Sequence, residues 1–179
     1  GKFVEKGSVY KGRKPVHWCW SCRTALAEAE VEYESHTSPS IYVKFAAEFE
    51  LGDTIPLAKG LPAFVVIWTT TPWTIPSNLG LAFHPEFEYV AIRVSFGGRD
   101  EAWIVARALL ERFAKGAGIS QFDILGTVSA KKLERKTCRH PMFDRKSLVI
   151  LGEHVTLEQG TGIVHTAPGH GQEDYVVGK

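Results

Sequence analysis

The sequence predicts a mixed α/β fold that is mostly β, with a barrel-like or sandwich core and a few peripheral helices. Most of the chain divides into short runs rich in β-branched and aromatic residues, and Gly, Pro, Asn or Asp bounds each run. Only a minority of the chain has a helical pattern. Many short strands with few helices are typical of a barrel or sandwich decorated by helices.

The first predicted strand covers residues 24–35, where Ala, Val and Tyr alternate with Glu. This period of two indicates a half-buried strand, despite the helix propensity of Ala and Glu. The clearest hairpin joins strands 89–94 and 102–106 through a segment that contains Gly97 and Gly98. The other predicted strands cover residues 41–45, 64–70, 79–83, 147–151 and 162–166.

One helix is predicted over residues 107–115. Ala108, Leu109 and Phe113 can share a face there, and Gly116 is placed as its stop. A second helix-like segment begins near Glu173-Asp174. We see no internal repeat and no low-complexity linker, so we expect a single domain over residues 1–179, with residues 1–24 as a peripheral segment. The sequence lacks an initiator Met and ends as that second helix begins, so we expect a fragment cut from a larger protein.

The composition is that of an ordinary globular protein. The chain has 179 residues, 44% of them hydrophobic, with 21 Lys+Arg against 20 Asp+Glu and a net charge of +1. Apolar runs are far shorter than the roughly 18 residues of a membrane-spanning helix, and no signal segment opens the chain. Three cysteines make no disulfide framework. We therefore expect a cytoplasmic location with no membrane contact, and not a protein that coats nucleic acid electrostatically.

The neutral total hides a segregated charge pattern. Residues 26–50 carry six Glu against one Lys, a local −5, whereas residues 131–146 carry seven Lys/Arg against two acidic residues, a local +5. Such a basic run is usually a solvated face. A phosphate-facing patch is the alternative.

Cys19 and Cys22 form a CxxC motif, whose spacing brings two thiolates onto one Zn²⁺ ion. A structural zinc site needs four ligands, and the chain has no second CxxC. Three interpretations stay open: a half-site completed by residues beyond this fragment, a site completed by Cys138 and His140, and two unligated surface cysteines. A thioredoxin-like role is disfavoured because the motif lies in no βαβ pattern.

The segment 68–78, WTTTPWTIPSN, follows an apolar strand. Its two prolines forbid a continuing helix or central strand, so they hold four Thr hydroxyls and the Asn78 amide on a stiff loop, where binding groups are often placed. The alternative is a purely structural turn. Such hydroxyls suit a ribose, an ester carbonyl or a positioned water, and they provide no strong nucleophile.

The segment 160–175, GTGIVHTAPGHGQEDY, carries His165 on a strand, then a Pro-Gly turn and an acidic pair. Taken alone, His165, His170 and Asp174 are the ligand types of a metal-dependent hydrolase. However, His170 lies between two glycines and no second His or carboxylate cluster converges nearby. GTG lacks both common phosphate-loop spacings, so that signal is weak.

Together, KPVHWCWSCRTALAEAEVEY, WTTTPWTIPSNLGLAFHP and GTGIVHTAPGHGQEDY resemble the editing domain of isoleucyl-tRNA synthetase. This domain is the insertion called connective peptide 1 in the class Ia synthetases for Ile, Val and Leu. The valyl and leucyl relatives typically have TTRP where this chain has TTTP, and PAHD where it has PGHG, so the isoleucyl type is favoured. The resemblance implies the barrel-like editing fold with peripheral helices.

The resemblance also implies an activity. The family's editing site hydrolyses valine wrongly attached to the 3′ end of tRNA(Ile), and the same activity extends to valyl-adenylate. The implied partners are that tRNA end, valyl-adenylate and the rest of an ATP-binding synthetase. No cofactor is implied for editing, and zinc on Cys19 and Cys22 would be structural in the full-length enzyme. HIGH and KMSKS signatures are absent, so we expect no synthetic activity in this fragment. The alternatives are a non-catalytic module that binds the tRNA 3′ end and a metal-dependent hydrolase using His165, His170 and Asp174.

Residue roles follow from the resemblance. Asp174 would anchor the substrate ammonium, and His165 would be the steric gate against isoleucine. The implied catalytic residues are Thr70, His165 and Asp174. The substrate-binding residues are Trp68, Thr69, Thr70, Thr71, Thr74, Asn78, His165 and Asp174, with Asn78 either touching substrate or bracing the loop. No nucleophile–base pair is evident, so we expect an oriented water, helped by the substrate's ribose hydroxyl, rather than a covalent intermediate.

Overall fold

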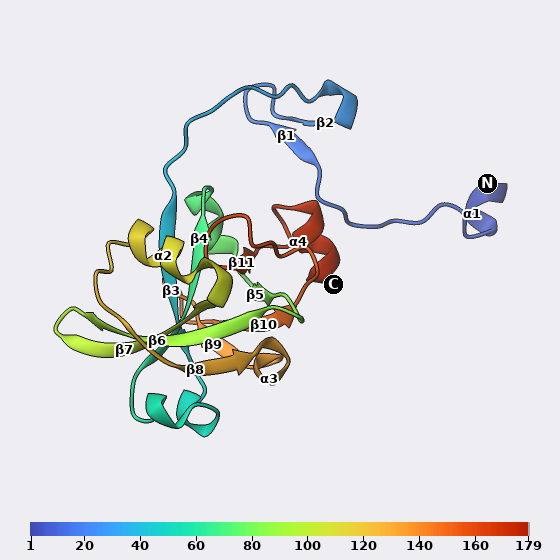
Figure 1. Cartoon of the computed structure of the whole chain (residues 1–179). Coiled ribbons are helices and arrows are strands. Elements are labelled where there is room, and N and C mark those ends of the chain that lie inside the picture. The colour runs from blue at the N-terminus through green and yellow to red at the C-terminus, as the bar shows by residue number, and fades with distance from the viewer. Residues whose placement is uncertain (179) are drawn as a thin grey trace. The chain divides into compact units, whose positions relative to one another are not determined.

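The computed structural model describes residues 1–178, and the chain separates into two compact units, Gly1–His36 and the residues from Thr37 on. The first unit contains the short helix α1 (Lys2–Glu5) and a hairpin of β1 (His17–Cys19) and β2 (Thr24–Leu26), drawn in blue in Figure 1. No residue of this unit is fully buried. The first unit thus extends to His36, whereas the peripheral segment predicted from the sequence covers residues 1–24.

The predicted strand over residues 24–35 is wrong. β2 ends at Leu26, and a 3-10 turn, Glu28–Glu30, follows directly. A strand needs a hydrogen-bonded partner, and β1 pairs with only the three residues of β2. Ala and Glu also have low β propensity, and the Glu30 carboxylate accepts a local bond from the Ala27 N–H at 2.7 Å. The alternation therefore did not produce a longer strand.

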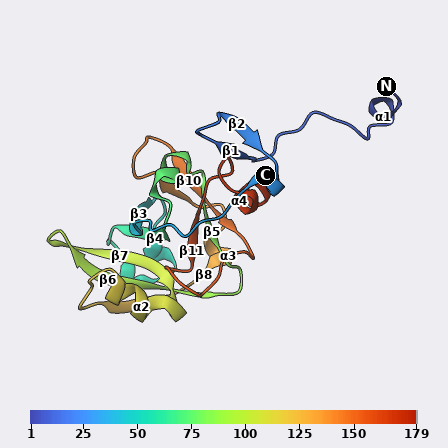
Figure 2. The same cartoon turned by 90° about the horizontal axis from the view of Figure 1, so that it is seen from above.

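The second unit is built on one mixed sheet that, in the described residues, has nine strands in the order β11-β5-β10-β9-β3-β4-β7-β6-β8. The strands are β3 (Ile41–Ala47), β4 (Ala63–Thr69), β5 (Gly80–Phe83), β6 (Glu88–Phe96), β7 (Arg99–Ala106), β8 (Asp123–Ser129), β9 (Thr137–Arg139), β10 (Lys146–Leu151) and β11 (Ile163–Thr166). β5 pairs with β10, and β4 with β7, in parallel; the other pairs are antiparallel. Figures 1 and 2 show the strands from two directions.

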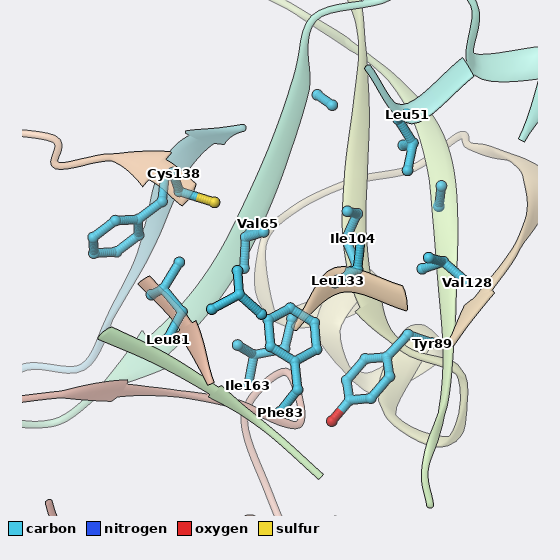
Figure 3. Packing of buried hydrophobic residues seen from close by; sticks show 14 of the residues in the cluster. Leu51, Val65, Leu81, Phe83, Tyr89, Ile104, Val128, Leu133, Cys138 and Ile163 are labelled. Carbon is cyan, nitrogen blue, oxygen red and sulfur yellow. The ribbon is translucent and has the colours of Figure 1, made fainter. Parts of the chain in front are cut away.

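The sheet curves back on itself, because β11, at one end of the order, also lies against β4. The predicted mixed, mostly β, barrel-like fold is therefore confirmed. Its interior is filled by apolar side chains such as Val65, Phe83, Ile104 and Ile163, which meet at the centre of Figure 3. Burying these side chains removes apolar surface from water and stabilises the barrel.

One polar atom in this core supports the site described below. The Tyr89 hydroxyl accepts the His84 N–H and donates to the Gly162 carbonyl, each at 2.8 Å. Burial raises the pKa of Tyr89 to about 12, so the hydroxyl stays protonated and remains a donor. It fixes the chain just before β11.

Helix α2 (Leu110–Gly116) follows a 3-10 turn, Arg107–Leu109, and covers the outer face of β6 and β7 (Figures 1 and 2). The helix predicted at 107–115 is thus present, with two differences. Ala108 is exposed, while Leu110 joins Phe113 in the buried cluster. The helix ends at Gly116, as predicted, but Gly116 is not left-handed and the Ala117 N–H still bonds the Phe113 carbonyl; the left-handed glycine is Gly118, with φ 69°.

The remaining predicted strands are confirmed within a few residues, and Gly97 and Gly98 form the predicted hairpin turn with φ of 60° and 80°. A helix, α4 (Gln172–Val177), begins where the second helix was expected. The sequence patterns did not predict α1, β1, β8, β9 or the short helix α3 (Ala130–Leu133). Across residues 1–178, no helix combines the length and the apolar character needed to cross a membrane.

Candidate functional site

An open pocket of about 560 Å³ lies where the end of β4, the 3-10 helix Pro72–Ser77, β11 and the start of α4 meet. This volume is typical of a site for a small molecule or a terminal nucleotide. The lining residues are Trp68, Thr69, Thr70, Thr71, Trp73, Thr74, His154, Thr156, Gln159, Gly160, Thr161, Gly162, Ile163, Val164, His165, His170, Gly171 and Asp174. The structure therefore brings together every predicted substrate-binding residue except Asn78.

The threonine loop is held by its own hydrogen bonds. Thr69 Oγ1 accepts the Thr71 N–H at 3.0 Å, and the Thr74 hydroxyl donates to the Thr71 carbonyl at 2.8 Å. Ser38 donates from outside the loop to the Thr70 carbonyl at 2.6 Å. The prolines Pro72 and Pro76 add the expected stiffness, since each fixes its own φ.

The connection between β9 and β10 braces the same loop from behind. The His140 Nε2–H donates to the Ile75 carbonyl at 2.9 Å, and His140 Nδ1 accepts the N–H groups of Met142 and Phe143. Arg145 donates to the Pro76 carbonyl. Both ring nitrogens of His140 are thus committed to backbone groups, which removes His140 from the zinc site considered with Cys138.

His165 forms a wall of the pocket on β11 and is 8% exposed. Its Nε2 lies 2.8 Å from Thr74 Oγ1, and its Nδ1 lies 3.3 Å from Asn78 Nδ2. Burial lowers the pKa of His165, and nearby Asp174 only partly opposes that effect. The ring is therefore neutral at pH 7, with both nitrogens engaged inside the protein.

Asn78 lies behind His165 and does not line the pocket. Its side chain is fully buried, with Nδ2 donating to the Gly80 carbonyl at 2.8 Å and Oδ1 accepting the Ser147 hydroxyl at 2.7 Å. The sequence left open whether Asn78 touches substrate or braces the loop. These contacts favour a bracing role.

Asp174 lies in the first turn of α4, where its Oδ2 accepts the Ala167 N–H at 2.8 Å. This bond holds the half-buried carboxylate at the pocket. Among the lining residues in the described part of the chain, Asp174 is the only acidic residue, and none is Lys or Arg. The electrostatic environment therefore favours a cationic group beside Asp174.

The GTG segment has a structural role that its sequence did not reveal. Gly160 has φ 80° and passes against the Trp68 ring, and Gly162 has φ 72° where a Cβ would collide with Ala106. Glycine is thus needed for left-handed backbone and close approach, not for binding a phosphate. The pocket residues His154, Thr156 and Gln159, which sequence reasoning missed, precede this segment; their only sequence signal is that proximity.

The metal-hydrolase arrangement is not formed. Within residues 1–178, no group of three or more His, Cys, Asp or Glu side chains is placed to hold a metal ion. His165 has both nitrogens engaged, and His170 Nε2 is hydrogen-bonded to the Ser77 hydroxyl at 2.9 Å. His165, His170 and Asp174 share a pocket without forming a ligand set.

Cys19 and Cys22 lie at the tip of the β1–β2 hairpin in the first unit. The Cys22 backbone N–H donates to Cys19 Sγ at 3.3 Å, and this bond lowers the pKa of the Cys19 thiol. A turn that presents two thiols with an N–H···S bond fits half of a tetrahedral zinc site. Within residues 1–178, these two cysteines belong to no group of three or more potential metal ligands, so the half-site and the unligated-cysteine interpretations both stay open.

The pocket, the barrel and the motifs define an editing-domain architecture, and comparisons with known proteins agree. The family model of class I tRNA synthetases (I, L, M and V) matches residues 1–151. The chain belongs to this family. It is 58% identical to the isoleucine–tRNA ligase of Geobacter sulfurreducens over 97% of its length, and 54% identical to that of Desulfotalea psychrophila over 99%. It spans 18% of the length of each of these two relatives.

Solved structures show the same fold. The crystal structure of GlLeuRS-CP1 has a TM-score of 0.65 at 19% identity, and the match covers 77% of this chain and 58% of that one. The P. knowlesi cytosolic leucyl-tRNA synthetase editing domain gives 0.63 at 13% identity, with 76% and 59% covered. The predicted resemblance to the connective peptide 1 editing domain is therefore confirmed for family and fold.

Proposed function

We propose that this chain is a proofreading hydrolase domain that cleaves the ester of valine wrongly attached to tRNA(Ile). One observation carries the proposal: Trp68, three consecutive threonines, His165 and Asp174 line a single pocket. The chain that contains this pocket is 58% identical to an isoleucine–tRNA ligase. The pocket has the size and the polarity for an aminoacyl group joined to a terminal adenosine.

Asp174 supports recognition of the aminoacyl group. Its carboxylate is the acidic group of the pocket, and a charge-assisted hydrogen bond to the substrate ammonium contributes about 1.5–3 kcal/mol. A tRNA 3′ end without an attached amino acid lacks this ammonium and binds less tightly. After hydrolysis the tRNA end no longer carries the ammonium group that Asp174 binds, so release of the tRNA from the pocket is favoured.

The charge of the pocket also favours the tRNA ester over valyl-adenylate as the substrate. Valyl-adenylate carries a phosphate next to the reacting carbonyl, and no Lys or Arg lines the pocket in residues 1–178 to receive it. The ester at the tRNA 3′ end places its reacting carbonyl on a neutral ribose. We therefore take the ester as the main substrate and valyl-adenylate as a slower one.

The chemistry proposed is attack by an oriented water. Thr69, Thr70 and Thr71 offer hydroxyl and backbone groups to the ribose, the adenine and that water, with Thr70 exposed at the pocket. His165 is unsuited as a general base because both ring nitrogens are engaged. Positioning and the substrate's own ribose hydroxyl supply the catalysis. Trapping of an acyl-enzyme would contradict this mechanism.

Size selection rests on the wall formed by Trp68, Thr74 and His165. Isoleucine has one methylene more than valine, and overpacking a fitted site costs about 1–3 kcal/mol. Such a penalty corresponds to roughly a 5- to 150-fold preference for valine.

The proposal places this activity in the cytoplasm, within a longer synthetase that holds the remainder of tRNA(Ile). Editing itself needs no cofactor in this scheme. Cys19 and Cys22 would hold a structural zinc ion together with two ligands outside the described residues. That zinc would fix the hairpin and would take no part in the hydrolysis.

The test compares deacylation of Val-tRNA(Ile) and Ile-tRNA(Ile) by this chain and by the longer ligase that contains it. Faster loss of valine, abolished by Asp174→Ala and retained in the matched control Glu173→Ala, is expected, since Glu173 is an exposed neighbour on the same helix. Equal rates on both esters, or full activity in Asp174→Ala, would refute the proposal. Retained 3′-end binding with an unchanged ester half-life would identify a binding module instead.

A further inference from the structure

Ser147 lies beneath the pocket on β10, fully buried and outside the residues that line the site. We propose that Ser147 is a positioning residue that sets the tautomer of His165 through the side-chain amide of Asn78. The effect on substrate selection rests on the proposed function, whereas the tautomer itself does not.

The first step is the orientation of the Asn78 amide. The Ser147 hydroxyl reaches Asn78 Oδ1 at 2.7 Å, and Asn78 Nδ2 reaches the Gly80 carbonyl at 2.8 Å. A carbonyl only accepts, so the amide nitrogen must face Gly80, and the Ser147 hydroxyl donates to the amide oxygen. The Gly80 carbonyl thus defines which end of this amide is oxygen, an assignment that the hydrogen-bond network has to provide, and the Ser147 hydroxyl supports this orientation as the donor to that oxygen.

In the second step, the orientation of the Asn78 amide determines which ring nitrogen of His165 carries the proton. Asn78 Nδ2 has a second hydrogen, and His165 Nδ1 lies 3.3 Å away. A donor in front of Nδ1 requires a lone pair on that nitrogen, so the single ring proton sits on Nε2. His165 therefore adopts the Nε2–H tautomer.

The third step reaches the threonine loop. The His165 Nε2–H points at Thr74 Oγ1, 2.8 Å away, and the Thr74 hydroxyl donates to the Thr71 carbonyl, also at 2.8 Å. Each group in the series Ser147, Asn78, His165 and Thr74 then donates a hydrogen bond to the next, and Thr74 donates to the Thr71 carbonyl. No hydroxyl in the series accepts or donates more than once. The opposite tautomer would require Thr74 to turn its proton toward His165 and release Thr71. The tautomer thus couples the wall of the pocket to the loop.

The tautomer is measured directly by NMR of the imidazole nitrogens in the 179-residue chain labelled with ¹⁵N-histidine. The wild type is expected to show a proton on Nε2 of His165. Ser147→Ala removes one of the two contacts that orient Asn78, and a roughly fivefold rise in the Nδ1–H form is expected from the loss of one hydrogen bond. Asn78→Asp places an oxygen at both ends of the group and is expected to move the proton to Nδ1 completely.

Thr166→Val is the matched control, because it removes a buried hydroxyl that has no partner among the described residues, next to His165 in the chain. Its His165 signals should match the wild type. If Ser147→Ala does not fold, Ser147→Cys keeps a weaker donor and should give an intermediate fraction. A proton on Nδ1 in the wild type, or unchanged His165 signals in the Ser147 variants, would overturn the proposal.

Activity gives a separate readout in the longer ligase. The ratio of valine to isoleucine deacylation is expected to fall several-fold in Ser147→Ala and to stay unchanged in Thr166→Val. If the wild-type ligase edits neither ester while the tautomer result holds, the proposed function fails and the positioning role of Ser147 stands. If editing is normal and selectivity is untouched by a measured change of tautomer, the coupling to specificity fails.

Discussion

Replacing His165 with alanine is expected to remove the discrimination between valine and isoleucine while leaving hydrolysis of the valine ester measurable. The imidazole lines the pocket on β11 and is held between Thr74 and Asn78. Under the proposed function it supplies bulk and not chemistry. Its loss should therefore change which ester enters more than how fast an ester is cleaved.

The magnitude follows from the packing argument. A penalty of about 1–3 kcal/mol against isoleucine corresponds to a rate ratio of roughly 5 to 150, since 1.4 kcal/mol is about tenfold. With alanine the extra methylene fits into the vacated space, and the ratio should approach one. Thr74 and Asn78 each lose a partner, so the free energy of unfolding should also fall by about 1–3 kcal/mol.

The assay is single-turnover deacylation of both esters by the longer ligase, with unfolding of the 179-residue chain measured in parallel. His165→Gln serves as the control, because its amide can still donate to Thr74 with less bulk than a ring. If His165 is a steric gate, the ratio of valine to isoleucine deacylation should fall in both variants. The free energy of unfolding should fall more in His165→Ala than in His165→Gln. A His165→Ala enzyme that prefers valine by the wild-type ratio would refute the reasoning.

Other expectations follow from particular contacts. Glu101 is fully buried and bonded to Lys44 at 2.6 Å, so Glu101→Ala should lower the free energy of unfolding, measured in urea, by about 3–5 kcal/mol because it leaves a charge unpaired. The pKa of His165 is lowered from its ordinary 6.5, so its contribution to stability is complete above pH 6.5 and is lost as the pH falls below that value; this dependence should vanish in His165→Gln. Lys132 and Lys136 are exposed in the basic stretch, and replacing either by Ala should reduce the salt dependence of tRNA binding by about one phosphate contact.

Most of the barrel strands were predictable because each is a compact run of β-branched or aromatic residues between turn formers, whereas β8 and β9 were not predicted. β4 and the hairpin of β6 and β7 are of this kind. The alternation of apolar residues with Glu was insufficient to form a strand over residues 24–35, because β1 pairs with only three of these residues. β9 is only three residues long and pairs on both sides, so its identity depends on neighbours that the local sequence does not reveal.

The site was predictable only where its residues are contiguous. The threonine loop and the segment from His165 to Asp174 are continuous motifs, and the fold brings both to one pocket. Ser147 is 69 residues from Asn78 and belongs to no motif. The two meet because β10 and β5 pair in parallel with Leu148 opposite Gly80, a register that sequence patterns do not determine.

The uncharged state of His165 determines how the pocket could distinguish two amino acids. Burial leaves His165 uncharged, and under the proposed function Asp174 binds the ammonium group that all amino acids share, so neither valine nor isoleucine would be rejected by charge. Discrimination of one methylene then has to be steric, and a steric filter fails when its walls move by a fraction of a bond length. The bonds from His140 and Arg145 to the threonine loop and from Tyr89 to the chain before β11 resist such movement. Loosening any of these buried braces should therefore admit isoleucine before it abolishes hydrolysis of the valine ester.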